Sequence, residues 1–204
     1  MGYTCHMRLA PLVPVSPSSP GDAELLVRAR AQDGAAFRAL FLRHAPAVRR
    51  LLGGLFRVAD DADEATQETF VRAHSALASL RDPARLRAWL LGIARIVWLD
   101  ACERQRRAER FPAIHAVQAV GEQELAPSPE GDALEVEADC VLAKALARLS
   151  ADRRTAVLLR LDQGLAYSEI ALALDWPLHK VKNEIHRARL AIRDELQAYL
   201  AGTR

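Results

Sequence analysis

The sequence predicts an all-α protein in which two small helical domains are joined by a flexible acidic linker. Half of its 204 residues are hydrophobic, but only 5% are aromatic. Alanine, leucine and arginine dominate, alternating runs of β-branched residues are almost absent, and apolar residues recur at spacings of three and four. The length leaves room for one or two domains, each large enough to bury a core.

Charge is distributed unevenly, although the net charge is only +2. Residues 84–110 contain seven basic and three acidic residues, residues 111–139 contain seven acidic and no basic ones, and residues 140–204 contain eleven basic and seven acidic ones. This pattern is expected for two nucleic-acid-binding domains joined by a linker. We therefore expect a domain at 22–110, a linker at 111–138 and a second domain at 139–204. Residues 1–21 before them are rich in proline and are expected to be a disordered extension.

The first domain is expected to begin with three short helices. Asp22 is placed to cap a helix over residues 23–31, and Asp33-Gly34 breaks that helix before a second one over residues 35–44. Pro46 is expected to open a third helix over residues 47–57. Short connections of this kind imply antiparallel neighbours.

The next expected helix, residues 60–77, carries an acidic stripe. Small and apolar side chains can face inward at Ala62, Ala65, Thr69, Phe70 and Ala73. The opposite face carries Asp61, Glu64, Gln67, Glu68 and Arg72. Such a stripe is most often a solvated surface. It indicates a docking face only where another feature implies a basic partner.

A loop at residues 77–85 leads into a strongly basic helix that ends near residue 110. Leu86, Leu90 and Val97 lie on its apolar side, and seven arginines load it with charge: Arg85, Arg87, Arg95, Arg104, Arg106, Arg107 and Arg110. This density suits phosphate neutralisation. Cations that complement the helix dipole are the alternative. That alternative covers some of residues 104–110, but not the three earlier arginines.

Residues 168–196 indicate a helix, a break at Asp175-Trp176-Pro177, and a longer helix. One apolar stripe on the second helix is formed by Leu178, Val181, Ile185, Ala188 and Ile192. Its other faces carry His179, Lys180, Lys182, Asn183, Glu184, His186, Arg187 and Arg189. A helix-turn-helix of this kind can insert its second helix into the major groove. The alternative is a solvated amphipathic helix in an ordinary bundle.

Other classes of function find little support in the sequence. Cys5, Cys102 and Cys140 lack the spacing of a metal site or a disulfide framework, and Cys5-His6 supplies only two of the four ligands of a typical zinc site. We expect no metal and no cofactor. Carboxylate pairs, catalytic triads and phosphate-binding glycine loops are absent at useful spacings, which argues against an enzyme. Without an apolar run of about 18 residues, we expect no membrane insertion and a cytoplasmic location.

Four passages in a fixed order carry a resemblance to a known family. They are Gly34-Ala35-Ala36-Phe37, Gln67-Glu68-Thr69-Phe70, Arg87-Ala88-Trp89-Leu90 with Ile93-Ala94-Arg95, and Gly164-Leu165-Ala166-Tyr167-Ser168-Glu169. The chain resembles bacterial RNA polymerase sigma factors of the extracytoplasmic-function type, group 4 of the sigma-70 superfamily. The resemblance implies a region 2 and a region 4, and it covers most of the chain from Asp22 to Leu200.

The resemblance implies that region 2 binds core RNA polymerase and melts the −10 promoter element. The surface for the polymerase β′ clamp helices would be Asp61, Asp63, Glu64, Gln67 and Glu68. A flipped −10 base would be held by Ser79, Leu80, Arg81 and Asp82. Phosphates would be contacted by Arg85, Arg95, Arg104, Arg106 and Arg107. A pocket and backbone charge can together offset the unstacking of a base, which costs a few kcal/mol.

The resemblance further implies that region 4 reads the −35 element and meets the polymerase β flap. Bases would be read by Lys180, Asn183, Glu184 and Arg187, because arginine favours guanine, asparagine adenine and glutamate the cytosine amine. Lys182, His186 and Arg189 would hold the backbone, and the turn containing His179 would set promoter choice. An anti-sigma factor, often membrane-anchored in this family, is a further expected partner.

The chain departs from the family pattern at several positions. Ile96 stands where an asparagine is common, Ser150 where a proline is common, and Asp175-Trp176 where the turn has glycine and a small aliphatic residue. Aspartate can still adopt the left-handed conformation that such a turn needs. Two alternatives therefore stay open at this point: a helix-turn-helix regulator that never recruits polymerase, and a degenerate sigma paralogue that only binds partners.

Overall fold

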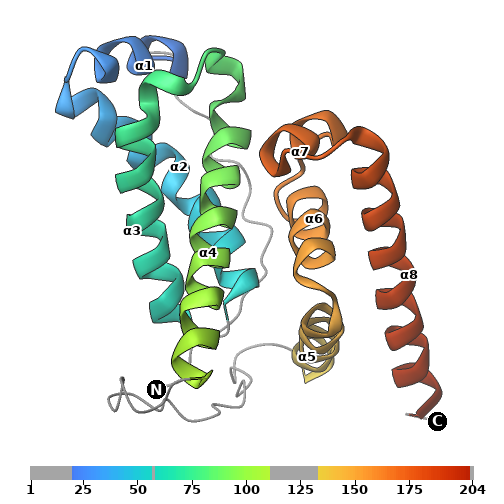
Figure 1. The fold of residues 1–204 in the computed structure, drawn as a ribbon. Coiled ribbons are helices and arrows are strands. Elements are labelled where there is room, and N and C mark those ends of the chain that lie inside the picture. The colour runs from blue at the N-terminus through green and yellow to red at the C-terminus, as the bar shows by residue number, and fades with distance from the viewer. Residues whose placement is uncertain (1–19, 57, 111–132, 203–204) are drawn as a thin grey trace.

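The computed structural model describes residues 20–56, 58–110 and 133–202, and the regular structure in these ranges is entirely helical (Figure 1). The all-α prediction is therefore confirmed for the described part of the chain. The N-terminal extension, with Cys5-His6, and most of the expected linker lie outside the described residues.

The described residues of the N-terminal half form four α-helices and two short 3₁₀ turns. They are α1 (Asp22–Arg30), α2 (Gly34–Leu55), α3 (Ala59–Ala76), η1 (Leu77–Ser79), η2 (Pro83–Arg85) and α4 (Leu86–Arg110). Helices α2, α3 and α4 pack on one another along their lengths, and α1 lies across one end (Figure 1). Leu51, Leu52, Leu91 and Ala94 are completely buried where the three long helices meet.

Pro46 does not open a new helix, because α2 runs through it without interruption. The predicted pair of short antiparallel helices is therefore wrong. An interior proline costs roughly 3 kcal/mol relative to alanine. This cost is offset because one buried stripe continues across the proline, from Leu40 to Val48 and Leu51. The apolar periodicity of the whole segment therefore decides the helix, although Pro46 is locally a helix breaker.

The start of α1 differs from its expected cap. Gly21, not Asp22, is the N-cap of α1, and the carboxylate of Asp22 instead binds Arg43 at 2.5 Å and His44 at 2.9 Å on α2. Asp33 does cap α2, since it accepts hydrogen bonds from the amides of Ala35 and Ala36. Tertiary partners thus compete with capping for the same carboxylates.

The C-terminal half contains α5 (Ala133–Arg148), α6 (Ala151–Leu161), α7 (Tyr167–Leu174) and α8 (Leu178–Gly202). Helix α5 begins inside the segment that we expected to be linker. The helix-turn-helix is present: α7 ends at Asp175, whose φ of 52° is left-handed, and α8 starts three residues later. The prediction that Asp175 can replace a glycine in this turn is confirmed.

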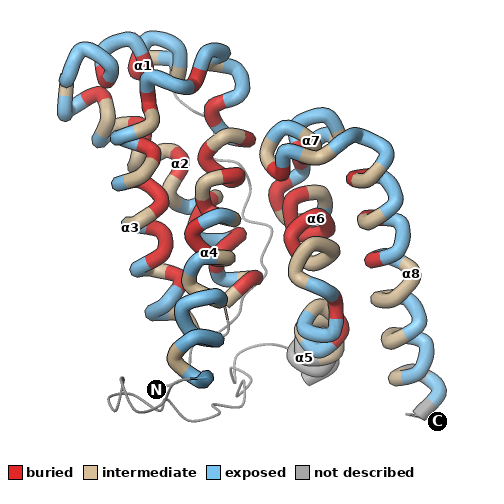
Figure 2. The backbone as a smooth tube through the Cα atoms, in the orientation of Figure 1, coloured by how far each residue is buried: buried red, intermediate tan, exposed pale blue. Residues whose placement is uncertain are grey.

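The two halves lie side by side, with α4 against α7 and α2 against α6 (Figure 1). Buried residues of both halves belong to one continuous apolar cluster, which reaches from Leu52 and Leu91 to Leu159 and Ile170. Figure 2 shows buried stretches on both α4 and α6. A smaller cluster of Leu149, Val157 and Ala188 lies within the C-terminal half.

Candidate nucleic-acid interface

Helix α8 presents a broad polar face from a firmly packed base. Val181, Ile185 and Ala188 have at most 1% of their surface exposed, so the helix is held by the predicted apolar stripe. Leu178, expected in the same stripe, is instead 43% exposed. Figure 2 shows exposed stretches alternating with buried or intermediate ones along α8. The exposed residues with polar or cationic side chains on its outer face are His179, Lys182, Asn183, His186, Arg187 and Arg189. Their spacing of three and four aligns hydrogen-bonding and cationic groups on one side of the helix.

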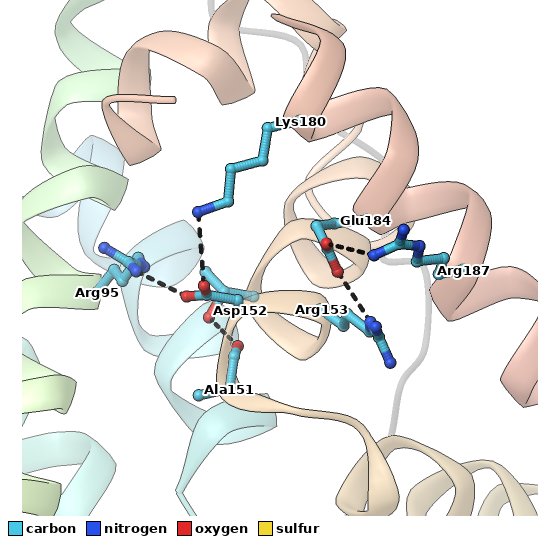
Figure 3. A network of polar contacts seen from close by, with 8 residues as sticks. Arg95, Ala151, Asp152, Arg153, Lys180, Glu184 and Arg187 are labelled. Atoms are coloured by element: carbon cyan, nitrogen blue, oxygen red, sulfur yellow. Dashed lines mark hydrogen bonds and ion pairs between the residues drawn. The ribbon is translucent and has the colours of Figure 1, made fainter. Parts of the chain in front are cut away.

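Two of the eight predicted DNA-contacting residues of α8, Lys180 and Glu184, make ion pairs with side chains of α6 (Figure 3). Glu184, whose side chain is 17% exposed, accepts a hydrogen bond from Arg153 Nε at 2.8 Å and lies 3.4 Å from Arg187 Nη1. Lys180 Nζ lies 3.8 Å from Asp152 Oδ2 and 3.9 Å from the centre of the Trp176 ring. In this conformation, both groups are engaged inside the protein.

The arginines of α4 also separate into two groups. Arg104, Arg106 and Arg107 are exposed near the C-terminal end, where Glu103 pairs with the last two. Arg95 is different: its side chain is 15% exposed and its Nη2 donates to Asp152 Oδ1 at 2.9 Å (Figure 3). The basic surface of α4 therefore excludes Arg95 in this conformation.

The loop between α3 and α4 has one buried side chain that anchors it to the core, and its remaining predicted residues are polar and exposed. Leu80 is 5% exposed, and its carbonyl oxygen accepts a hydrogen bond from Arg30 of α1. Asp82 caps η2 through the amide of Ala84 at 3.0 Å and pairs with Arg85 at 3.0 Å. The exposed members of the predicted set are thus Ser79, Arg81, Asp82 and Arg85.

The acidic face of α3 points away from the core. Asp61, Glu64 and Gln67 are exposed, whereas Asp63 pairs with Arg49 of α2, and this hydrogen bond lowers the pKa of the Asp63 carboxyl. Glu68 shares Arg72 with Asp100 of α4, at 2.7 Å and 2.6 Å. The face is fixed in place by ion pairs at its edges and open at its centre.

Sequence reasoning missed the residues that join the two halves. Asp152 stands in the first turn of α6, where an acid needs no explanation beyond the helix dipole. Arg87 Nη2 donates to the carbonyl of Gln163 at 2.8 Å across the same junction. Local sequence carries no signal for such pairs, because their partners lie 57 and 76 residues away.

Metal and membrane sites find no support in the part of the chain that the structure describes. There, no three histidine, cysteine or carboxylate side chains come together as a metal-binding group. Nor does any helix within it have the length and apolar character needed to cross a bilayer.

Two family models match this chain. One, described as Sigma-70 region 2, covers residues 40–108, and one described as Sigma-70, region 4 covers residues 141–192. Among curated proteins, the RNA polymerase sigma-H factor of Pseudomonas aeruginosa is 32% identical over 193 residues, which cover 88% of this chain and 95% of that protein. The chain belongs to the extracytoplasmic-function sigma factors. As such, it is an alternative sigma factor that directs transcription initiation.

Further relatives agree with this assignment. The ECF RNA polymerase sigma-E factor of Escherichia coli strain K12 is 30% identical, covering 86% of this sigma factor and 94% of that one. The sigma factor RpoE of Bartonella quintana, solved with the anti-sigma factor NepR, superposes with a TM-score of 0.63 at 25% identity, over 79% and 96% of the two chains. CnrH, solved with the cytosolic domain of CnrY, gives 0.64 at 28% identity, over 88% and 99%.

Proposed function

We propose that this sigma factor reads the −35 element with the exposed face of α8. One observation carries the proposal: six polar or cationic side chains share a single face of a helix that Val181 and Ile185 hold rigidly. Asn183 and Arg187 lie one turn apart and supply the groups that recognise adenine and guanine edges. Lys182, His186 and Arg189 are placed beside them for phosphates, and His179 lies at the leading end of the helix.

Lys180 and Glu184 take part only after their internal contacts change. Glu184 bridges Arg153 and Arg187, so its role in this conformation is to orient the Arg187 guanidinium. Direct contact with a cytosine amine requires that the Arg153 pair opens. Lys180 likewise reaches a base only by leaving Asp152 and the face of Trp176.

In this proposal, the −10 element is bound by the loop between α3 and α4 and by α4 itself. Ser79, Arg81 and Asp82 are exposed on a loop that Leu80 anchors in the core, which is the arrangement needed to hold a base outside the stack. Leu80 contributes through this anchoring. Phosphates of the same strand are contacted by Arg85, Arg104, Arg106 and Arg107, with Arg95 added once it is released from Asp152.

Core polymerase docks on the acidic face of α3. Asp61, Glu64 and Gln67 form its open centre, and Asp63 and Glu68 lie at its edges. This face is matched to the β′ clamp helices, while the C-terminal half meets the β flap. The two family matches, over residues 40–108 and 141–192, support a division into two domains, and the second begins with α5 at Ala133 rather than at residue 139.

Regulation by an anti-sigma factor follows from the structural relatives. RpoE of Bartonella quintana and CnrH share this fold at 25% and 28% identity, and they were solved with NepR and with a cytosolic domain of CnrY. We infer that a protein of this kind, membrane-anchored or free, binds the present chain in the cytoplasm. The sigma factor itself acts by binding alone and catalyses no reaction.

Run-off transcription tests the proposed function. Core polymerase is mixed with the full chain on a pool of templates that carry randomised −35 and −10 segments. We expect defined transcripts from a subset of templates, and none with core alone. A chain that binds duplex DNA but never core is the regulator alternative, and a chain that binds neither is the degenerate paralogue; either result overturns the proposal.

A further inference from the structure

A partly buried carboxylate on α8 connects this helix to α6, the helix that precedes the helix-turn-helix (Figure 3). Glu184 Oε2 accepts a hydrogen bond from Arg153 Nε at 2.8 Å, and Glu184 Oε1 lies 3.4 Å from Arg187 Nη1. We propose that Arg153 is a positioning residue that sets base preference without touching DNA, because it fixes Glu184 and Glu184 fixes the Arg187 guanidinium. The inference deepens the proposed function and rests on it, since it takes Arg187 as a reader of the −35 element.

Glu184 lies at the border between the buried stripe of α8 and its outer face. It directly precedes Ile185, which is 1% exposed, and it lies three residues before Arg187 on the same flank of the helix. The side chain of Glu184 is 17% exposed, whereas that of Arg153 is 36% exposed and that of Arg187 is 59% exposed. The carboxylate is therefore held close to the core, and the Arg187 side chain extends from it toward solvent.

Arg187 depends on a second contact because its own pair with Glu184 is weak. An ion pair between residues i and i+3 on a helix surface contributes little, since water screens it and two long side chains have to be ordered. Arg153 reaches Glu184 from another helix and forms a charge-assisted hydrogen bond where the carboxylate is mostly shielded from water. With one carboxylate oxygen fixed in this way, the other oxygen offers Arg187 a partner in a constant place.

A fixed Arg187 matters because guanine recognition requires a defined orientation of the guanidinium. An arginine that reads guanine sets two N–H groups in one plane against O6 and N7. The contact with Glu184 uses Nη1 of Arg187, and the other N–H donors of the guanidinium are available for a base. A side chain that is ordered before binding also loses less conformational entropy on the DNA.

A neighbouring ion pair favours the same setting of α8 on α6. Asp152, the residue before Arg153, lies 3.8 Å from Lys180, one turn before Glu184 on α8. Consecutive residues of α6 thus meet residues one turn apart on α8, and the order of charge alternates. If α8 slid by one turn along α6, Glu184 would approach Asp152 and like charges would meet. The alternation therefore stabilises the position in which Arg153 holds Glu184.

Three variants separate positioning from direct contact. Arg153→Ala removes the residue under test, Glu184→Gln removes the charge of the connecting side chain but keeps its size, and Arg187→Ala removes the reader. Arg148→Ala is the matched control. Arg148 of α5 also pairs with a glutamate of α8, but this glutamate is Glu195, about two turns beyond Arg187.

Base preference is measured with holoenzyme assembled from core polymerase and each full-length variant. Affinity for a duplex selected from a random pool by the wild-type holoenzyme is followed by fluorescence anisotropy, in competition with duplexes changed at single −35 positions. We expect Arg153→Ala and Glu184→Gln to lower discrimination about fivefold at the base pair that Arg187→Ala affects, as for the loss of one hydrogen bond. Adding Arg153→Ala to Arg187→Ala should cause no further loss there, because both act through one guanidinium. Arg148→Ala should match wild type.

The order of the Arg187 side chain gives an independent readout in the DNA-free chain. NMR relaxation of its Nε–H group reports motion on the picosecond to nanosecond timescale. We expect the order parameter to fall in Arg153→Ala and in Glu184→Gln, and to keep its wild-type value in Arg148→Ala. Helix content from circular dichroism identifies a variant that fails to fold, and the other variant then decides.

Three results would overturn the positioning role of Arg153. Equal weakening by Arg153→Ala on all sequences, with a salt slope lower by about 1, would make this residue a phosphate contact. Loss of preference at different base pairs in Glu184→Gln and Arg187→Ala would make Glu184 a direct reader. An Arg187 order parameter that is the same in wild type, Arg153→Ala and Glu184→Gln would show that neither residue fixes the guanidinium.

Failure of the proposed function has a different signature. In that case the wild-type holoenzyme selects no duplex, or Arg187→Ala leaves every base preference unchanged. The NMR comparison then decides by itself whether Arg153 positions Arg187.

Discussion

The two halves of the molecule hold their candidate sites in different ways. In α1–α4, three long helices pack on one another around a core that includes Leu51 and Leu91. Most of the side chains proposed for docking and for the −10 element project outward from this core, and Leu80 and Arg95 are the exceptions. In α5–α8, the reading helix is held by a short stripe, and Lys180 and Glu184 are tied to residues of α6. The centre of the proposed docking face is exposed in this conformation, whereas two side chains of the proposed reading face are paired with α6.

This difference has a physical origin. Ion pairs at the edges of the acidic face, such as Arg49 with Asp63, join neighbouring helices of one half and leave its centre open. The pairs that occupy the reading helix involve α6, which also holds Arg95 of the other half. If α8 binds DNA through Lys180 and Glu184 themselves, these side chains must therefore give up contacts within their own half, whereas the open centre of the acidic face needs no such change.

The largest expected effect concerns the acidic face of α3, the proposed docking surface for core polymerase. Changing Glu64 and Gln67 to lysine should weaken core polymerase binding by at least about 100-fold, because like charges brought together at an interface cost several kcal/mol. Both side chains are exposed, so helix content should not change. Affinity is measured by fluorescence anisotropy with labelled sigma factor. Glu24→Lys, an exposed charge reversal on α1, is the control; equal losses for both variants would remove the docking assignment.

A second prediction separates anchoring from recognition within the −10 loop. Leu80→Ala should lower the free energy of unfolding by about 2–4 kcal/mol, since a buried side chain is lost and a cavity remains. Ser79→Ala, at the exposed neighbour, should change it by less than about 0.5 kcal/mol. Urea denaturation measures both. If the two variants are equally stable, Leu80 does not anchor the loop.

A third prediction separates base recognition from phosphate binding on the exposed face of α8. Arg187→Ala should weaken binding to the selected duplex by about 1–3 kcal/mol and relax the preference at one base pair. Lys182→Ala should weaken binding to all sequences and lower the slope of log affinity against log salt by about 1. Competition with single-base variants at several salt concentrations distinguishes the two. Uniform weakening by Arg187→Ala would assign that residue to phosphate.

The smallest effect concerns pH and the packing of the N-terminal half. Burial lowers the pKa of His44 despite the nearby Asp22 of α1, and Arg43 and Arg87 act in the same direction as burial. The unfolded chain thus takes up this proton at a higher pH than the folded protein. The resulting stability is present above pH about 6.5 and is lost as the pH falls below it.

His44→Gln should flatten the fall in urea midpoint between pH 7 and pH 5.5. His179→Gln, on the exposed end of α8, is the control and should leave the fall unchanged. An identical pH dependence for wild type and His44→Gln would mean that other groups cause the acid sensitivity.

The sequence by itself determined the helical class, the two basic segments, the buried stripe at Val181, Ile185 and Ala188, and the left-handed turn at Asp175. These features depend on residues within one or two helical turns of each other, so periodicity and turn chemistry reveal them. The acidic face of α3 was found in the same way, because a stripe on one helix is a local property.

Only the tertiary structure decided what crosses between elements. In the structure, α2 continues through Pro46, and Asp22 pairs with Arg43 instead of capping α1. Leu80 is buried although the neighbouring residues of its loop are exposed. The structure also joins Arg95, Asp152 and Lys180 at one carboxylate. Each of these outcomes depends on which helix faces lie together, and that is set by the sum of many weak apolar contacts over the whole core, which no local pattern records.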